Sequence, residues 1–254
     1  MSWFRGLLVA ALAVAVAFLF VPVLAIFVDT APGDLVASLG EEGSLEALRL
    51  SLICSGVAIV LIVLVGTPAA YLLATRRFRG RSVIVTLVEL PLVLPPAVAG
   101  IGLLAALGPQ GLLGGHGPEL VLTTAGVIVA LTFVSAPFYM RQAQAGFEAM
   151  DATLLDASRT LGAGEARTFL RVAIPAAGPS LVAGLALAWG RALGEFGATL
   201  MFAGSFRGIT QTVPLAIYER FSTDFTGALA LSAVLVGVSA ALLASVKLVG
   251  GAAR

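Results

Sequence analysis

Few charged side chains within the apolar stretches of this sequence could meet a substrate. Arg191 and Glu195 lie four residues apart, so a helix would place both on one face. Charges inside a membrane usually face a polar path or the interior of a helix bundle. Arg191 could contact an anion directly, or the two side chains could neutralise each other and brace or gate neighbouring helices, which we favour. Glu89 is equally ambiguous, since its carboxylate could simply reach the membrane surface.

The sequence lacks the groups needed for nucleotide or thiolate-metal chemistry. A phosphate-binding loop requires Gly-x-x-x-x-Gly-Lys-[Ser/Thr], and the only lysine, Lys247, stands between Val246 and Leu248. A single cysteine, Cys54, excludes an intrachain disulfide and a thiolate cluster. We therefore predict no catalytic residues, no metal site and no cofactor bound by this chain, so that any ATP is hydrolysed on a partner subunit.

Composition indicates the solvent in which these charges sit. Of 254 residues, 59% are hydrophobic and 11% charged, against about a quarter charged in soluble domains. A helix needs about 20 apolar residues to cross the hydrocarbon layer. Six stretches are long enough: residues 6–28, 45–75, 82–107, 120–140, 178–203 and 225–249. The prediction is an all-α integral membrane protein with six transmembrane helices, forming one domain over residues 1–254.

Basic residues set the expected orientation, because arginine and lysine accumulate on the cytoplasmic side. One set of connecting segments carries most of them: Arg5, Arg76, Arg77, Arg79, Arg81, Arg141, Arg159, Arg167, Arg171, Lys247 and Arg254. The opposite segments carry Arg207 and Arg220, and acidic residues crowd the first of them. Both termini are therefore expected in the cytoplasm, in a cell membrane crossed several times. The net charge of +1 gives no preference for nucleic acid.

The segment 142–177 is a long cytoplasmic loop with a helical pattern. Asp151 suits a helix N-cap, and Met150 and Leu155 are spaced to form a hydrophobic staple around it. Gly162 stands where a left-handed C-cap is needed. A second helix is expected at about 165–172.

Pro175 should stop the second helix, giving a bent pair of short helices. Such a pair could lie in a groove on another protein. It could equally lie on lipid headgroups. The residue pattern alone leaves both open.

This loop also carries a family resemblance. Asp156-Ala157-Ser158, Gly162 and the run from Val172 to Pro175 resemble the "EAA" signature of binding-protein-dependent ABC importer permeases. That signature reads Glu-Ala-Ala, three residues, Gly, nine residues, Ile-x-Leu-Pro; Asp156 and Ser158 are conservative departures. The resemblance implies a helix that docks into a separate ATPase subunit, with these coupling residues: Asp151, Leu155, Asp156, Ala157, Ser158, Arg159, Leu161, Gly162 and Pro175.

The apolar stretches extend the resemblance. Prolines 91, 95 and 96 interrupt the third stretch, and such breaks survive in a bilayer only where protein or a water-filled cavity covers them; a structural kink without a role in transport is the alternative. Segments 91–100, 190–204 and 210–218 resemble permeases for molybdate, and somewhat less those for tungstate and sulfate.

The resemblance implies the type I importer fold, and one copy of each motif implies a homodimer. The implied translocation path or gate comprises Pro95, Pro96, Gly190, Arg191, Gly194, Glu195 and Thr199. The external loop 204–224, with Thr210, Gln211 and Thr212, is expected to contact an extracytoplasmic oxyanion-binding protein.

The function expected from these features is alternating access, in which an ATPase dimer drives import of a tetrahedral oxyanion. Molybdate is the first candidate, and sulfate or tungstate the alternative. A secondary transporter or channel without an ATPase is a different class; it would need charged residues along several spans and leaves the cytoplasmic helix pair unexplained. A membrane anchor without transport would not need the broken third span.

Overall fold

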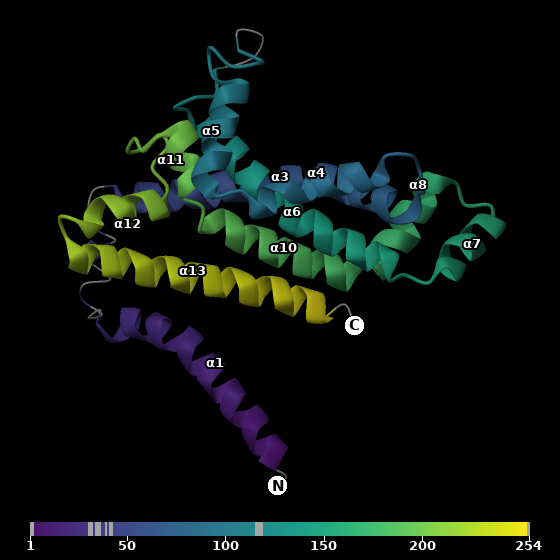
Figure 1. Ribbon diagram of the computed structural model, residues 1–254, viewed down its shortest axis with the longest axis horizontal. Coiled ribbons are helices and arrows are strands. Elements are labelled where there is room, and N and C mark those ends of the chain that lie inside the picture. Colours follow the sequence, from purple (N-terminus) through teal and green to yellow (C-terminus); the bar gives the residue numbers. More distant parts are fainter. Residues whose placement is uncertain are drawn as a thin grey trace.

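A computed structural model describes residues 3–29, 33, 37, 38, 40, 43–114 and 119–252. Every regular element in these ranges is a helix (Figure 1). Arg254 lies outside these ranges, as do Asp34, Glu41 and Glu42, which are among the acidic residues of the first outer segment. The long helices are α1 (Trp3–Val28), α3 (Ser44–Thr75), α6 (Thr124–Glu148) and α13 (Phe225–Ala252). The shorter elements are α4 (Arg81–Val93), α5 (Pro96–Leu107), α7 (Ala152–Thr160), α8 (Glu165–Thr168), the π-helix η1 (Phe169–Ala173), α9 (Ile174–Ala176), α10 (Gly178–Leu193), α11 (Gly197–Ala203) and α12 (Val213–Phe221).

Within the described part of the chain, four helices are long and apolar enough to cross a membrane, and two bent pairs raise the number of candidate crossings to as many as six. The pairs are α4 with α5, bent by 119°, and Glu165–Ala176 with α10, bent by 74°. The break that the prolines predicted in the third span is confirmed, whereas the fifth predicted span is wrong as one continuous helix. Residues 82–107 are split at Leu94 and Pro95, and residues 178–203 are split between Leu193 and Gly197. The fourth predicted span continues to Glu148, which shortens the cytoplasmic loop.

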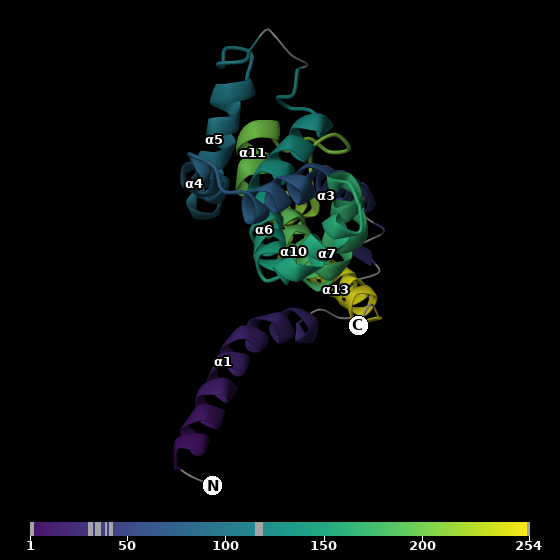
Figure 2. The same ribbon diagram turned by 90° about the vertical axis from the view of Figure 1, so that its right-hand side faces the viewer.

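Helices α3, α6 and α10 run side by side and form the centre of the bundle (Figures 1 and 2). Glycines permit their close approach: a Cβ on Gly66 would lie 3.2 Å from the Tyr139 ring, and a Cβ on Gly146 would lie 2.4 Å from Ser180 Cβ. The Tyr139 hydroxyl also lies 2.6 Å from Thr67 Oγ1. Small residues and buried hydroxyl bonds are the usual means of joining helices in a bilayer.

The outer halves of the two broken stretches pack on each other. A Cβ on Gly100 of α5 would lie 2.7 Å from the carbonyl oxygen of Ala198 in α11, and one on Gly197 would lie 2.9 Å from Pro96 Cβ. Helices α5 and α11 are therefore in backbone-level contact, and they join α6 through Phe202 and its neighbours.

Helix α1 stands away from the bundle, and the C-terminal end of α1 is the part that lies nearest to it (Figures 1 and 2). Helix α1 makes a small contact with α13. None of its residues is buried. An apolar helix with this exposure needs lipid or another protein around it.

Candidate coupling and translocation sites

The segment 150–177, here called the coupling hairpin, begins at a capped helix. Asp151 Oδ1 accepts a hydrogen bond of 2.9 Å from the backbone N–H of Thr153. This bond stabilises the carboxylate and holds the pKa of Asp151 below its ordinary value. The predicted N-cap is confirmed.

The C-terminal end of α7 is a Schellman motif. Gly162 has φ of +78°, its N–H donates to Arg159 O at 2.9 Å, and the N–H of Ala163 donates to Ser158 O at 3.1 Å. A Cβ on Gly162 would meet nothing within 4 Å. The predicted glycine C-cap is therefore confirmed, and its requirement for glycine lies in the backbone angle.

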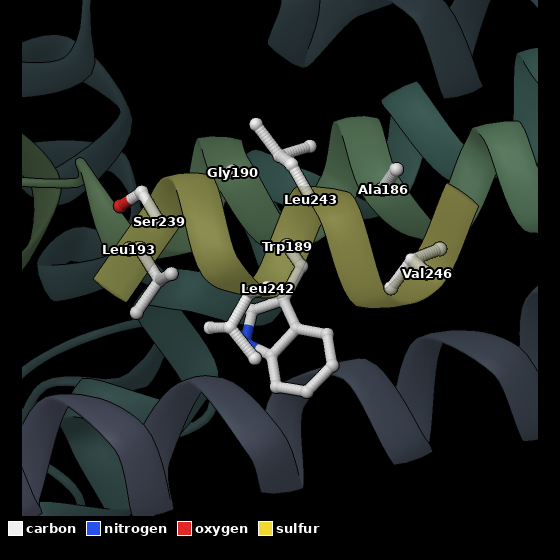
Figure 3. A pocket seen from close by; sticks show the side chains of 8 residues that line it. All are labelled: Ala186, Trp189, Gly190, Leu193, Ser239, Leu242, Leu243 and Val246. Atoms are coloured by element: carbon white, nitrogen blue, oxygen red, sulfur yellow. The ribbon is translucent and has the colours of Figure 1, made fainter. Parts of the chain in front are cut away.

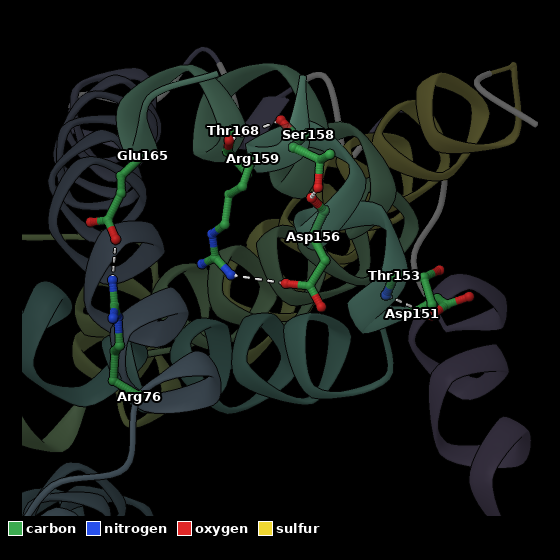
Figure 4. Close-up of polar contacts among 9 residues, drawn as sticks. Arg76, Asp151, Thr153, Asp156, Ser158, Arg159, Glu165 and Thr168 are labelled. Atoms are coloured by element: carbon green, nitrogen blue, oxygen red, sulfur yellow. Dashed lines mark hydrogen bonds and ion pairs between the residues drawn. The ribbon is translucent and has the colours of Figure 1, made fainter. Parts of the chain in front are cut away.

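Contacts within the hairpin and with the bundle hold it in place, including the Phe169 ring against Tyr71 and Phe147. Leu155 is the one buried residue of α7, in a hydrophobic cluster with Phe147 and Ala173 against which Met150 also packs. Ser158 Oγ lies 2.9 Å from Thr168 Oγ1. Glu165 forms an ion pair with Arg76 at the end of α3, and Arg159 pairs with Asp156 at 3.2 Å (Figure 4).

Three leucines of the hairpin are exposed among its polar and charged side chains. Leu161 is 87% exposed, and Leu154 and Leu170 are also exposed. Figure 1 shows α7 at one extreme end of the molecule, with α11 and α12 at the other. Leu154 and Leu170 were not among the predicted coupling residues, although helical spacing around Leu155 would have placed Leu154 on the outer face. Exposed apolar side chains on a rigid projection are suited to docking.

Pro175 does not stop the second helix as predicted. Helical backbone runs from Glu165 through α9 to Ala176. The turn before the proline is widened, because the N–H of Ile174 bonds to Phe169 O, five residues back. Pro175 then occupies an initial position of α9, where its missing N–H is not needed.

Arg191 and Glu195 form an ion pair of 2.6 Å, in which Glu195 is 1% exposed. They do not share one continuous helix, since α10 ends at Leu193. The other oxygen of Glu195 accepts a bond of 2.7 Å from the N–H of Ala198. Glu195 thus joins the guanidinium of α10 to the first turn of α11, where a negative charge is favoured.

The other predicted path residues separate into two groups. Pro95 and Pro96 lie at the start of α5 beside Gly197, and Thr199 is buried on α11 with no hydrogen-bond partner for its hydroxyl among the described residues. Gly190 instead lines a small groove between α10 and α13 (Figure 3). The groove's side chains carry no charge, and their polar groups are the Ser239 hydroxyl and the Trp189 indole N–H, which donates to Ser55 Oγ: Ala186, Trp189, Leu193, Ser239, Leu242, Leu243 and Val246. Such a surface offers nothing to an oxyanion.

Thr210, Gln211 and Thr212 are at most 3% exposed. Their burial argues against direct contact with a binding protein. Thr210 and Gln211 are hydrogen-bonded within the loop, whereas the buried Thr212 hydroxyl has no hydrogen-bond partner among the described residues. Thr210 Oγ1 accepts from the N–H of Phe206 at 2.9 Å, and Gln211 Nε2 donates to Glu219. The exposed large side chains of this region include Phe206, Arg207, Ile209, Tyr218 and Phe221.

Glu89 does not stand alone at the membrane surface. Its carboxylate lies 2.9 Å from Nε of Arg141 on α6. Sequence reasoning assigned Arg141 to the cytoplasmic loop and missed this pair, since α6 continues well past residue 140.

Comparison with known proteins completes these observations. Residues 62–251 match the family described as "Binding-protein-dependent transport system inner membrane component". The molybdenum transport system permease protein ModB of Mycobacterium bovis is 40% identical over 237 residues, covering 91% of this chain and 89% of that protein. The sulfate transport system permease protein CysW of Synechococcus elongatus is 34% identical, covering 80% and 72% respectively. A bacterial ABC transporter involved in alginate import superposes with a TM-score of 0.76 at 16% identity, covering 97% of this chain and 94% of that one.

Proposed function

Because the chain belongs to the family of binding-protein-dependent transport system inner membrane components, we propose that it is the permease subunit of an ATP-driven importer of molybdate. It is an ABC importer permease with the type I fold and a multi-pass protein of the plasma membrane. Its proposed partners are a second copy of itself, a cytoplasmic ABC ATPase dimer and an extracytoplasmic oxyanion-binding protein. ATP binds to the ATPase, and this chain binds no cofactor.

The topology proposed here has six crossings: the four long helices, the α4–α5 pair, and the α10 part of the second bent pair. Both termini and the coupling hairpin then lie in the cytoplasm, with α12 outside. The placement of α7 and α12 at opposite ends of the bundle supports this arrangement (Figure 1). The arginines beside the hairpin agree with it, since Arg76, Arg77 and Arg79 are exposed at the same end.

The observation that carries the proposal is the coupling hairpin itself. Both ends of α7 are capped, Leu155 is its one buried residue, and Leu154 and Leu161 are exposed beside it. Closure of the ATPase would push this rigid unit, and the continuous helical turns of α8, η1 and α9 would carry the displacement into α10. The Arg191–Glu195 pair would extend it to α11. A shift between two states requires that the ATPase contact them differently.

Reconstitution tests this function. The permease, its ATPase and the binding protein would be placed in liposomes with external molybdate. We expect molybdate uptake to depend on ATP inside the liposomes and on the binding protein. Sulfate should compete with molybdate only weakly. Uptake by the permease alone, driven by an ion gradient, would overturn the proposal.

Leu161 gives a sharper arm of the same experiment. Replacing it with Asp puts a charge on the most exposed apolar side chain of the hairpin. We expect at least tenfold weaker association with the ATPase, since a charge is costly at the core of an interface. Leu112→Asp, on a side chain 89% exposed in the segment after α5, is the matched control and should leave association unchanged.

A further inference from the structure

Helix α4 is weakly packed for an element in the membrane. None of its residues is buried, and Val83, Leu87 and Val93 are each at least 60% exposed. Among the other helices, α4 packs mainly against α6. Elements with little buried apolar surface are those that move at low free-energy cost.

Two ion pairs hold α4 on α6. Arg81 Nη2 lies 2.7 Å from Glu148 Oε1, and Glu89 Oε1 lies 2.9 Å from Arg141 Nε. Helices α4 and α6 run antiparallel, so the first residue of α4 is paired near the end of α6. At 1.5 Å per residue, the two pairs are about 12 Å apart along α4. Arg81 is fixed further by a bond of 2.6 Å to Leu73 O, and Glu148 by one of 2.9 Å from Gln144 Nε2.

The chain on either side of α4 differs in how it is held. Beyond the 119° bend, α5 is in backbone-level contact with α11 through Gly100 and Gly197. Before it, Arg76 is paired with Glu165 of the coupling hairpin. Helix α4 therefore lies between a fixed outer half and the hairpin, and the two ion pairs link it to α6.

We propose that the Arg81–Glu148 and Glu89–Arg141 pairs form a latch that holds α4 on α6 in the state seen here and opens when the coupling hairpin moves. Glu89 and Arg141 are positioning residues, which set the position of the inner half of the broken span. The role in transport rests on the proposed function, whereas the latch itself can be tested on the permease alone.

Exchanging the charges of Glu89 and Arg141 tests the latch, because it distinguishes the effect of the ion pair from the effect of changing either residue alone. Cys54, the only cysteine, is first replaced by Ser, and Leu87→Cys on α4 and Ala145→Cys on α6 carry spin labels. The permease in nanodiscs should give one narrow distance distribution. Glu89→Arg or Arg141→Glu alone should broaden and lengthen it, because like charges then face each other. The double exchange should restore it. Glu219→Arg, which disrupts the Arg207 pair of the outer loop, should have no effect.

An unchanged distribution in both single variants, or a double exchange that does not restore it, would overturn the latch. If single variants do not fold, the double exchange still decides, because only a true pair survives reversal. In the complete transporter, we expect each single variant to lower molybdate uptake per ATP by about tenfold and the double exchange to recover most of it. Restored distances with uptake unaffected by the single variants would overturn the role in transport. A wild-type complex that moves no molybdate would refute the proposed function while leaving the latch intact.

Discussion

The coupling hairpin and the outer loop 204–224 were both expected to be docking surfaces, and the structure treats their characteristic residues in opposite ways. The hairpin buries only Leu155 of α7 and exposes the side chains on either side of it. The outer loop buries Thr210, Gln211 and Thr212 almost completely. A recognisable motif can therefore be a contact surface at one end of a molecule and an internal fastener at the other.

The difference follows from how each polar group is satisfied. A buried hydroxyl or amide is tolerated when it is hydrogen-bonded, and the outer loop supplies partners for Thr210 and Gln211. Ser51 Oγ on α3 also accepts from the N–H of Val213, which ties the start of α12 to the bundle. The hairpin has few such ties, so its polar residues remain at the surface.

Loss of the anchor should have the largest effect. Leu155→Ala removes a buried side chain of the hairpin, at an expected cost of about 2–4 kcal/mol. The hairpin should then open locally, and ATP-driven uptake should fall strongly. Amide hydrogen exchange across residues 152–160 measures the opening. Leu154→Ala, on the exposed neighbour, should change the exchange little; equal effects of the two variants would show that the hairpin has no single anchor.

The C-cap of the hairpin should give the next largest effect. Gly162→Val forces a β-branched residue to φ of +78°, which costs about 1–2 kcal/mol or more. Because there is open space around the position, the effect arises from the backbone alone. We expect faster amide exchange in the last turn of α7 and reduced uptake with ATP hydrolysis retained. Gly162→Asn, which tolerates this conformation, should restore most of both; unchanged uptake with Val would count against a mechanical role for the cap.

A substitution in the outer loop should lower the stability of the permease, whereas the hairpin substitutions should lower ATP-driven uptake. Thr210→Val keeps the shape of the side chain but leaves the N–H of Phe206 without its acceptor, at about 1–3 kcal/mol. We expect a lower melting temperature of the purified permease with ATPase association unaffected. Thr210→Ser retains the hydroxyl and serves as the control. If Thr210→Val had normal stability but bound the binding protein more weakly, Thr210 would instead act in binding-protein contact, as the sequence predicted.

These contrasts show what the sequence could and could not predict. Caps such as Asp151 and Gly162 were predicted correctly because they depend on local backbone chemistry. The break between α10 and α11 was missed because the predicted span ran without interruption through Gly194 and Glu195. The break is stabilised by a capping bond from the N–H of Ala198 to the Glu195 carboxylate, which no periodicity reveals. Burial of Thr210 and pairing of Glu89 with Arg141 depend on residues far apart in sequence, so they required the tertiary structure.

Acid should loosen the outer loop by a small amount. The hydrogen bond from Arg207, with a further one from Gln211, holds the pKa of Glu219 below its ordinary value of 4.5. A carboxylate with a lowered folded-state pKa stabilises the fold above the unfolded-state pKa, and this contribution disappears as pH falls through the folded-state value. Because the Glu219 side chain is 46% exposed, screening limits the effect to about 0.5 kcal/mol. Amide exchange in α12, corrected for its intrinsic pH dependence, should therefore show lower protection at pH 3 than at pH 5. Glu219→Gln should remove that difference, and a difference that persists in this variant would show that Glu219 is not the source of the acid response.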